Sequence, residues 1–486
     1  MINYIGKLLN NEYLLIHKIG KGSFAIVWLA YKITNKQFYA IKMQNIEDYD
    51  EACDELLLLK EIKKKNNSFL NTFIESFDYK TPEGKHKCIV LELLGGSTFE
   101  LIRKGKYKKG LPIKVVKEMT RQVLKGLITL HNELGIIHAD IKPENLLIFG
   151  INKTVKEFID MFKENDYDEI YNKYVKEYQI INKPKNMKFL QNKEIVNQII
   201  KKTCDEIIYN IYDEDKHPMI AELDYNPFKK QSSRSVEHYL NSESSSVKHN
   251  NRNQSISDNT DESSFYSSES EIVNEKSDTE SDTYSEHSNV SEKDIEVIKS
   301  ESEITESNET YCILDDFYID NCLIRVSDFG NSFHINEKPD MEIQTRYYRA
   351  PEIILALKYN EKCDIWSLGC TIFELLTGDI LFDPDHNRTF NRDKQHIYWM
   401  YQVLGKIPQH ILKKSKRYKY LFDDNGNIKG VNWKIDNLPI KDTLINDYNF
   451  SVKDANEIHN FLLKLLDYDH TKRLSAKEIL KEDWLK

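Results

Sequence analysis

The chain has 486 residues, of which 40% are hydrophobic, enough for two or three ordinary domains with a sizeable core. Its net charge of −10 comes from one stretch, because residues 237–310 hold 19 acidic against 5 basic residues and leave the remainder mildly basic. No dense basic run predicts nucleic-acid binding, no apolar run approaches the roughly 18 residues of a membrane span, and the 7 scattered cysteines suit reduced thiols inside a cell.

The first 95 residues are predicted to be rich in strands. Leu56, Leu57 and Leu59 are expected on the apolar side of a helix that interrupts them. Alternating apolar residues and turn signals predict strands over 13–19, 26–33, 37–43, 71–79 and 87–92, with the helix over about 46–64.

Helical periodicity begins after Gly95-Gly96 with a predicted helix over 112–132, and helices dominate again from the short strand over 322–326 to the end. A strand-rich lobe followed by a helical lobe is an α+β, bilobal arrangement with a crevice between the lobes. The expected division is an N-lobe over 13–94, the first part of a C-lobe over 95–149, an insert over 150–320 and the rest of the C-lobe over 321–486.

A glycine-containing segment at residues 20–27 (Gly-Lys-Gly-Ser-Phe-Ala-Ile-Val) joins the first two predicted strands. Glycines let a backbone approach phosphate groups and point N–H groups at them, although an ordinary hairpin turn fits the same pattern. Lys42 on the third strand is a candidate phosphate ligand if an acidic side chain faces it. Glu55 on the following helix is the preferred partner, and Asp54 competes with it.

The most specific motif is the run His-Ala-Asp-Ile-Lys-Pro-Glu-Asn-Leu-Leu at residues 138–147. Asp328-Phe329-Gly330 follows the strand over 322–326, and Ala350-Pro351-Glu352 lies downstream. A triplet alone would be chance-level, but the order and spacing of the three motifs are specific. An ordinary polar loop after a helix is a remote alternative explanation for the run at residues 138–147, because all ten residues match the motif.

These motifs, over residues 13–148 and 322–485, resemble the eukaryotic protein kinase fold. The resemblance implies an enzyme that uses ATP and Mg²⁺, and Lys142, two residues after Asp140, is typical of serine/threonine kinases. In that family the residue at Asp140 accepts the proton of the substrate hydroxyl, and the one at Lys142 neutralises charge on the transferred group. Thr345 would bridge Asp140 and Lys142.

The same resemblance implies magnesium and nucleotide ligands. Asn145 and Asp328 would bind Mg²⁺, and Lys42 with Glu55 would form the ion pair of an assembled site. Leu91 would be the gatekeeper, and the backbone of Glu92 and Leu94 would meet adenine. The remaining nucleotide-binding residues would be Ile19, Gly20, Lys21, Gly22, Ser23, Phe24, Ala25, Ile26, Val27, Ala40 and Leu147, although core packing also accounts for the apolar ones.

Among kinases, residues 345–352 (Thr-Arg-Tyr-Tyr-Arg-Ala-Pro-Glu) resemble the CMGC group, and the chain is most similar to the SR-protein kinases. The likeness extends over residues 138–145, 328–331, 343–346, 376–382, 392–393 and 404–408, and to the long insert. Ala350-Pro351 and the acidic insert depart from that family. In its acidic docking groove Asp379 matches, but Gln395 and Gln402 stand where acids are expected.

Three residues predict activity without activation-loop phosphorylation. Ala139 stands where many kinases carry an arginine that binds an activation-loop phosphate. Asp340 and Glu342 align with the phosphorylated threonine and tyrosine of MAP kinases. We therefore expect a constitutively active enzyme.

The insert has two parts that differ in composition. Residues 152–228 are rich in Lys, Tyr and Ile and are predicted to be partly helical. Residues 232–310 are polar and acidic and are predicted to be disordered. The acidic part is either a solvated linker, since loop closure costs grow slowly with length, or a regulatory tether. Phosphorylation of Ser268 and Ser277, which each have Glu three residues on, would make such a tether more negative.

Protein substrates are the expected partners of a monomer that contacts neither nucleic acid nor membrane. The N-terminus lacks the pattern of a signal peptide, so an intracellular, cytoplasmic location is expected. The basic stretch over 413–417 is either a nuclear signal, which would add a nuclear pool, or a solvated helix face.

Two other functions predict different residues. A pseudokinase scaffold predicts the loss of Lys42, Asp140, Asn145 or Asp328, and all four are present. A kinase for lipids or small molecules is disfavoured because residues 345–352 resemble the peptide-binding loop of protein kinases.

Overall fold

The computed structural model describes residues 3–103, 107–182, 187–217, 220, 322–337, 339, 342–384, 391–431 and 434–486. The stretch over 232–310, with Ser268 and Ser277, lies outside these residues, and so does Asp340. All the helices and strands described below belong to one unit, which comprises residues 1–228 and 310–486.

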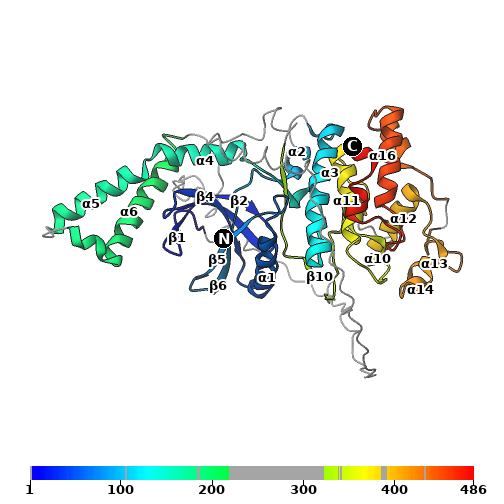
Figure 1. Cartoon of the computed structure of the whole chain (residues 1–486), viewed down its shortest axis with the longest axis horizontal. Helices are drawn as coiled ribbons and strands as arrows, with labels where there is room; N and C mark the ends of the chain where they lie inside the picture. The colour runs from blue at the N-terminus through cyan, green and yellow to red at the C-terminus, as the bar shows by residue number, and fades with distance from the viewer. Residues whose placement is uncertain are drawn as a thin grey trace, which may run out of the picture. The chain divides into compact units, whose positions relative to one another are not determined.

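A six-stranded antiparallel sheet forms the N-terminal lobe, with strand order β1-β2-β3-β4-β6-β5 (Figure 1). Its strands are β1 (Leu8–Leu9), β2 (Tyr13–Lys21), β3 (Ala25–Lys32), β4 (Gln37–Gln44), β5 (Phe73–Lys80) and β6 (Lys85–Leu91). The five strands predicted from apolar alternation are confirmed. Strand β1 was missed because two residues are too short to show an alternating pattern.

Helix α1 (Tyr49–Lys65) packs against this sheet and confirms the predicted helix. Its buried residues include Glu55, Leu56, Leu59 and Ile62, which recur at helical spacing. The expectation that Leu57 shares this face is wrong, because its side chain is 60% exposed. One residue along a helix turns the side chain by about 100°, which carries Leu57 away from the stripe that Leu56 shares with Leu59.

The C-terminal lobe is helical, which confirms the predicted α+β class. Helix α11 (Cys363–Thr377) is buried at every residue and packs on α3 (Ile113–Ile128) and α16 (Val452–Leu465). A π-helical turn, η2 (Thr129–Leu134), extends α3. The other helices are α2 (Thr98–Arg103), α10 (Pro351–Ile354), α12 (Arg392–Leu404), α13 (Gln409–Leu412), α14 (Tyr418–Leu421), α15 (Ile440–Asn446) and α17 (Ala476–Ile479).

Two small antiparallel ladders hold the polar motifs. Strand β8 (Leu146–Ile148) pairs with β9 (Ile324–Val326), and β7 (Ile136–Ile137) pairs with β10 (Phe333–His334). The first ladder places the end of the 138–147 motif beside the start of Asp328-Phe329-Gly330, although nearly two hundred residues separate them in sequence.

The start of the predicted insert forms helices that complete the N-terminal lobe. These are α4 (Lys153–Glu164), α5 (Tyr167–Asn182) and α6 (Lys193–Ile211). Phe158 of α4 stacks on His17 of β2 with ring centroids 3.6 Å apart, and the Tyr212 hydroxyl donates to Ile16 O at 3.0 Å. Burial lowers the pKa of His17 to about 3, so its ring is neutral and packs as part of the core.

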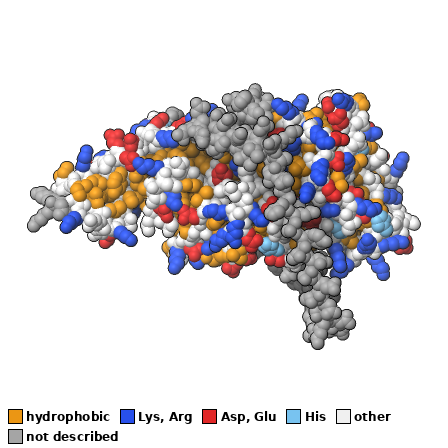
Figure 2. Space-filling view, in the orientation of Figure 1, with side chains coloured by type: hydrophobic (Ala, Val, Ile, Leu, Met, Phe, Trp, Pro, Cys, Tyr) orange, Lys and Arg blue, Asp and Glu red, His pale blue; other side chains and the backbone are white. Residues whose placement is uncertain are grey.

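Helices α5 and α6 form a hairpin whose described tip is apolar. Ile180 and Ile181 are each 73% exposed there, and Met187 is 48% exposed. Figure 2 shows hydrophobic side chains gathered over this end of the hairpin. None of the helices in the described part of the chain is long and apolar enough to cross a membrane.

Candidate active site

A buried lysine joins two acidic side chains from different elements. Lys42 Nζ on β4 donates to Glu55 Oε1 at 2.8 Å and Oε2 at 2.9 Å, and to Asp328 Oδ1 at 2.7 Å. Glu55 is 3% exposed on the inner face of α1, whereas Asp54 is exposed. Glu55 is therefore the partner of Lys42.

The electrostatics keep this lysine charged. Burial alone would lower the pKa of Lys42, but the carboxylates of Glu55 and Asp328 outweigh that effect and raise it. The Lys42 ammonium in turn holds the pKa of Asp328 below its ordinary value. A fixed cation thus stands beside an ionised carboxylate.

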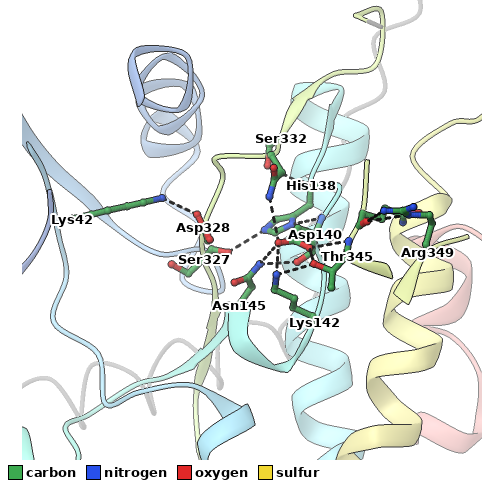
Figure 3. A network of polar contacts seen from close by, with 12 residues as sticks. Lys42, His138, Asp140, Lys142, Asn145, Ser327, Asp328, Ser332, Thr345 and Arg349 are labelled. Atoms are coloured by element: carbon green, nitrogen blue, oxygen red, sulfur yellow. Dashed lines mark hydrogen bonds and ion pairs between the residues drawn. The ribbon is translucent and has the colours of Figure 1, made fainter. Parts of the chain in front are cut away.

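Asp140 lies at the centre of a second polar cluster (Figure 3). Its Oδ1 accepts from Thr345 Oγ1 at 2.6 Å, and its Oδ2 accepts from Lys142 Nζ at 2.7 Å. Lys142 Nζ also donates to Thr345 Oγ1 at 2.9 Å, so Thr345 bridges the other two residues. The carboxylate is buried, hydrogen-bonded on both oxygens and held in one orientation.

Helix α11 fixes the backbone that carries Asp140. Asp364, which is fully buried on α11, accepts from the backbone N–H groups of His138 and Ala139, each at 2.8 Å. Ala139 has a φ of 62°, a left-handed conformation that costs energy for a residue with a Cβ. The Asp364 carboxylate offsets that cost and therefore positions the loop that carries Asp140.

Asn145 and Asp328 offer oxygen atoms on neighbouring backbone segments. Asn145 Nδ2 donates to Asp140 O at 2.8 Å and to Asp140 Oδ2 at 3.1 Å, and Asn145 O accepts from Ser327 N at 2.9 Å. No hydrogen bond in the described part of the chain involves Asn145 Oδ1 or Asp328 Oδ2. One amide and one carboxylate oxygen, completed by phosphate oxygens and water, fit the small set of protein ligands that Mg²⁺ takes.

The segment between the lobes combines backbone N–H groups with nearby apolar side chains. Glu92 N donates to Thr72 O at 3.0 Å and Gly95 N donates to Ile148 O at 2.8 Å, whereas no hydrogen bond from Leu94 N is found in the described residues. Ala40 pairs with Leu91 in the sheet and is 7% exposed. Ile19, Val27 and Leu147 are half-buried.

The glycine segment forms a tight hairpin between β2 and β3. Gly22 N donates to Ala25 O at 2.9 Å and closes the turn. Gly20 pairs with Val27, and Lys21 pairs with Ile26. Lys21, Gly22, Ser23 and Phe24 are exposed, so the tip is open to a ligand.

The segment after Asp328-Phe329-Gly330 is held by ion pairs. Glu352 and Arg473, both fully buried, form a bidentate pair at 2.6 and 2.9 Å. Glu342 contacts Arg349, and it lies 3.7 Å from Arg346. This glutamate therefore faces two arginines of the same segment.

The sequence assigned no role to two residues of this region. Gln344 has a φ of 70°, its carbonyl accepts from Arg349 at 2.8 Å, and its Nε2 donates to Ser367 Oγ at 2.8 Å. Asp393 on α12 binds both Arg346 and Arg417. Asp393 and Gln344 lie in the matched stretches 392–393 and 343–346, but the sequence indicated no structural role for either of them.

A buried glutamate in α11 ties the same segment to α2. Glu374 accepts from the Tyr348 hydroxyl at 2.6 Å and from Arg103 at 2.8 Å. Burial raises the pKa of Glu374 to about 7, and the nearby carboxyl groups of Glu144 and Asp379 add to the rise. The charge of this cluster therefore changes near neutral pH.

The sequence is similar to those of known proteins over most of the chain. The protein kinase domain family matches residues 13–160 and 313–485. A putative serine/threonine-protein kinase, L205, of Acanthamoeba polyphaga mimivirus is 34% identical over 99% of this chain and 88% of its own. Protein kinase dsk1 of Schizosaccharomyces pombe and SRSF protein kinase 3 of Mus musculus are each 28% identical over 99% of this chain, and over 82% and 87% of theirs.

Proposed function

The chain belongs to the protein kinase family and is a serine/threonine kinase similar to the SR-protein kinases, and we propose that Asp140 is its catalytic base. The observation that carries this assignment is the orientation of Asp140, whose two carboxylate oxygens are held by Thr345 and Lys142. A base held in this way can accept the proton of a substrate hydroxyl as that oxygen bonds to the transferred phosphorus.

The other polar residues hold charge in place around that step. Lys142, 2.7 Å from Asp140, neutralises negative charge on the transferred group. Lys42, fixed by Glu55, holds the phosphates of ATP, and the exposed backbone of the glycine segment covers them. Asn145 and Asp328 would hold Mg²⁺, which would supply positive charge to neutralise the phosphate groups. Positioning and charge neutralisation account for most of the rate in this reaction class.

Adenine binds between the lobes in this proposal. Leu94 N donates to the ring and Glu92 O accepts from it, with Leu91 as the gatekeeper. The apolar walls are Ile19, Val27, Ala40 and Leu147. This assignment is supported by the partnerless N–H of Leu94 among the described residues.

The proposed substrates are Arg/Ser-rich proteins. One relative is named an SRSF protein kinase, and 99% of this chain aligns with it. The docking groove expected for arginine-rich segments is less acidic here: Asp379 accepts from the Tyr448 hydroxyl at 3.0 Å, and Gln402 is 8% exposed. We therefore propose recognition of Arg/Ser sequences close to the phosphorylated residue, with weaker docking of distant arginines.

Constitutive activity is also proposed. The Glu342 carboxylate, which contacts Arg349 and approaches Arg346, supplies the negative charge that a phosphate would bring to these arginines. Ala139 leaves the loop at residues 138–147 without an arginine that would need such a phosphate. The segment is thus ordered by its own residues.

The enzyme is further proposed to act as a monomer in the cytoplasm with a nuclear pool. The nuclear assignment rests on the basic stretch over 413–417, of which Lys413, Lys414 and Lys416 are exposed. Arg417 is engaged in packing, since it donates to Ile354 O at 2.7 Å.

A peptide panel tests the substrate assignment. Phosphatase-treated enzyme is given radiolabelled Mg-ATP with an Arg-Ser repeat, a Ser-Pro peptide or casein, and Asp140→Asn serves as the blank. We expect transfer to the Arg-Ser repeat first. Preference for Ser-Pro or casein would overturn the Arg/Ser assignment and leave the kinase assignment intact, and no transfer to any peptide with ATP still bound would favour a scaffold.

A further inference from the structure

Ser327, the residue directly before Asp328, is buried and hydrogen-bonded to both lobes. Its N–H donates to Asn145 O at 2.9 Å, and its carbonyl accepts from His138 Nε2 at 3.1 Å (Figure 3). These two bonds go to the C-terminal lobe. A third bond goes to the N-terminal lobe, because Asn71 Nδ2 donates to Ser327 Oγ at 2.8 Å. The backbone that leads into Asp328 is therefore fixed from two sides.

The backbone of Asn71 is itself anchored beside the end of β9. Asn71 N donates to Val326 O at 2.9 Å, and Val326 N donates to Phe69 O at 2.8 Å. Leu70 forms a parallel bridge with the same valine. The Asn71 side chain, which is 4% exposed, thus extends toward Ser327 from a segment that is already held in place by its main chain.

Asn71 is a polar residue in apolar surroundings. Its neighbours Leu70 and Phe73 belong to one hydrophobic core together with Val326. Asn71 Oδ1 has no hydrogen-bond partner among the described residues. A buried amide with an unsatisfied atom is less favourable than an apolar side chain of the same size. Packing therefore gives no reason for an asparagine at this position, whereas the bond to Ser327 does.

Asp328 is the residue that gains from this support. Its φ of 64° lies in the left-handed region, which is uncommon for residues other than glycine. Lys42 Nζ holds its Oδ1 at 2.7 Å, and Oδ2 is the oxygen left to face a metal ion. The direction of this carboxylate depends on the backbone of Ser327, because a rotation there would swing the side chain away from Asn145.

We propose that Asn71 is a positioning residue for the magnesium site: through Ser327, it fixes the Asp328 carboxylate relative to Asn145. This inference rests on the proposed function, in which Asp328 and Asn145 are the magnesium ligands. Loss of the bond should weaken the binding of Mg²⁺ together with ATP. It should not weaken the binding of ATP alone, which depends on Lys42 and on the segment between the lobes.

ATP binding with and without Mg²⁺ separates positioning from stability. The double variant Asn71→Leu with Ser327→Ala removes both partners of the bond, so it leaves neither group buried and unpaired and should melt close to wild type. Binding of a fluorescent ATP analogue is measured in EDTA and in saturating Mg²⁺. We expect the gain in affinity that Mg²⁺ brings to fall by roughly three- to tenfold in this variant, while the affinity in EDTA is unchanged.

A single variant and a matched control pair complete the test. Asn71→Leu alone leaves the Ser327 hydroxyl without its donor, so it should melt below the double variant and lose the same part of the Mg²⁺ effect. The control pair is Asn67→Leu with Thr129→Val. It breaks another amide–hydroxyl bond of 2.8 Å, which joins the same segment to η2 at the end of α3. The control pair should melt at a lower temperature and keep the full Mg²⁺ effect.

The inference is overturned if the double variant gains as much ATP affinity from Mg²⁺ as wild type does. It is also overturned if the affinity of that variant falls equally in EDTA and in Mg²⁺, or if the control pair loses the Mg²⁺ effect to the same extent, since a general loss of structure would then explain the result. Wild-type protein that binds ATP but gains no affinity from Mg²⁺ would instead overturn the magnesium assignment of the proposed function, and this inference with it.

Discussion

The carboxylate of Glu342 and the guanidinium of Arg349 form an ion pair within the segment between Asp328-Phe329-Gly330 and Ala350-Pro351-Glu352. Arg349 also donates to the carbonyl of Gln344, whose backbone has a φ of 70°. The pair therefore stabilises a bend that residues without glycine's freedom rarely adopt. Its location beside Thr345 connects it to the catalytic cluster.

Removal of this charge should lower activity moderately. Glu342→Gln is expected to reduce kcat by roughly three- to fivefold, because an ion pair with a half-exposed carboxylate contributes up to about 1 kcal/mol. Phosphatase-treated enzyme is assayed with Mg-ATP and the best peptide. Glu342→Asp should retain more activity, and the exposed Asp424→Asn is the control. Wild-type kcat in Glu342→Gln would refute this role for the pair.

The pair between Lys42 and Glu55 predicts separate effects on activity and stability. Lys42→Met should abolish phosphoryl transfer, and it should also destabilise the fold by about 3–5 kcal/mol, since Glu55 is left buried without its cation. Adding Glu55→Leu should restore much of the melting temperature but none of the activity. Thermal unfolding and the kinase assay distinguish the two effects, and a double variant that regains activity would contradict the assigned role of Lys42.

Arg473 should be essential to the fold of the C-terminal lobe. Arg473→Ala leaves Glu352 buried and unpaired, a loss of about 3–5 kcal/mol, and Arg473→Lys should not rescue it because the pair is bidentate. Thermal unfolding measures both variants against the exposed neighbour Lys472→Ala, which is expected to shift stability by less than about 0.5 kcal/mol. Equal melting temperatures for Arg473→Ala and Lys472→Ala would show that the buried pair contributes little.

The raised pKa of Glu374 predicts a pH-dependent stability. The folded protein binds this proton more tightly than the unfolded chain, so the contribution of Glu374 is greatest at low pH and is lost as pH rises from the ordinary glutamate pKa to about 7. The melting temperature of Glu374→Gln, relative to that of wild type, should therefore rise between pH 5 and pH 8. A difference that is flat with pH would mean that Glu374 titrates at its ordinary value.

Asp328→Asn tests the assigned magnesium site. The variant keeps the size of the side chain but loses one charge. The Mg²⁺ concentration for half-maximal activity should therefore rise on the order of tenfold or more, the scale of effect that follows from changes around metal ligands. Activity is titrated with Mg²⁺ at fixed ATP, with Asp383→Asn as a control outside the polar cluster. An unchanged Mg²⁺ requirement would remove Asp328 from the metal site.

Short motifs predicted the polar site well because each motif holds its residues on a rigid local element. Asp140, Lys142 and Asn145 come from one loop, and β8 with β9 is enough to bring Asp328 beside them. The register of α1 also identified Glu55 as the partner of Lys42. These assignments need only periodicity and a single strand pairing.

Contacts between distant elements could not be predicted from the sequence. Asp393 with Arg346 and Arg103 with Glu374 depend on how α2, α11 and α12 pack, which no local pattern encodes. The helices α4 and α6 were placed in an insert because they interrupt the motif order. Their apolar residues, such as Phe158 of α4 and Ile207 of α6, nevertheless pack in the same core as Ile16 of β2, and this depends on three-dimensional complementarity.

The most direct measurement of the central claim compares wild type with Asp140→Asn in phosphoryl transfer and in ATP binding. The account predicts that the variant binds Mg-ATP with nearly the wild-type Kd, because within the described residues the Asp140 carboxylate is hydrogen-bonded to Thr345, Lys142, Asn145 and Asn331, and not to the proposed phosphate ligand Lys42. Its kcat should fall by roughly 10²–10⁴-fold, the contribution typical of a positioned general base. A variant that transfers phosphate at the wild-type rate would contradict the assignment of Asp140 as the base.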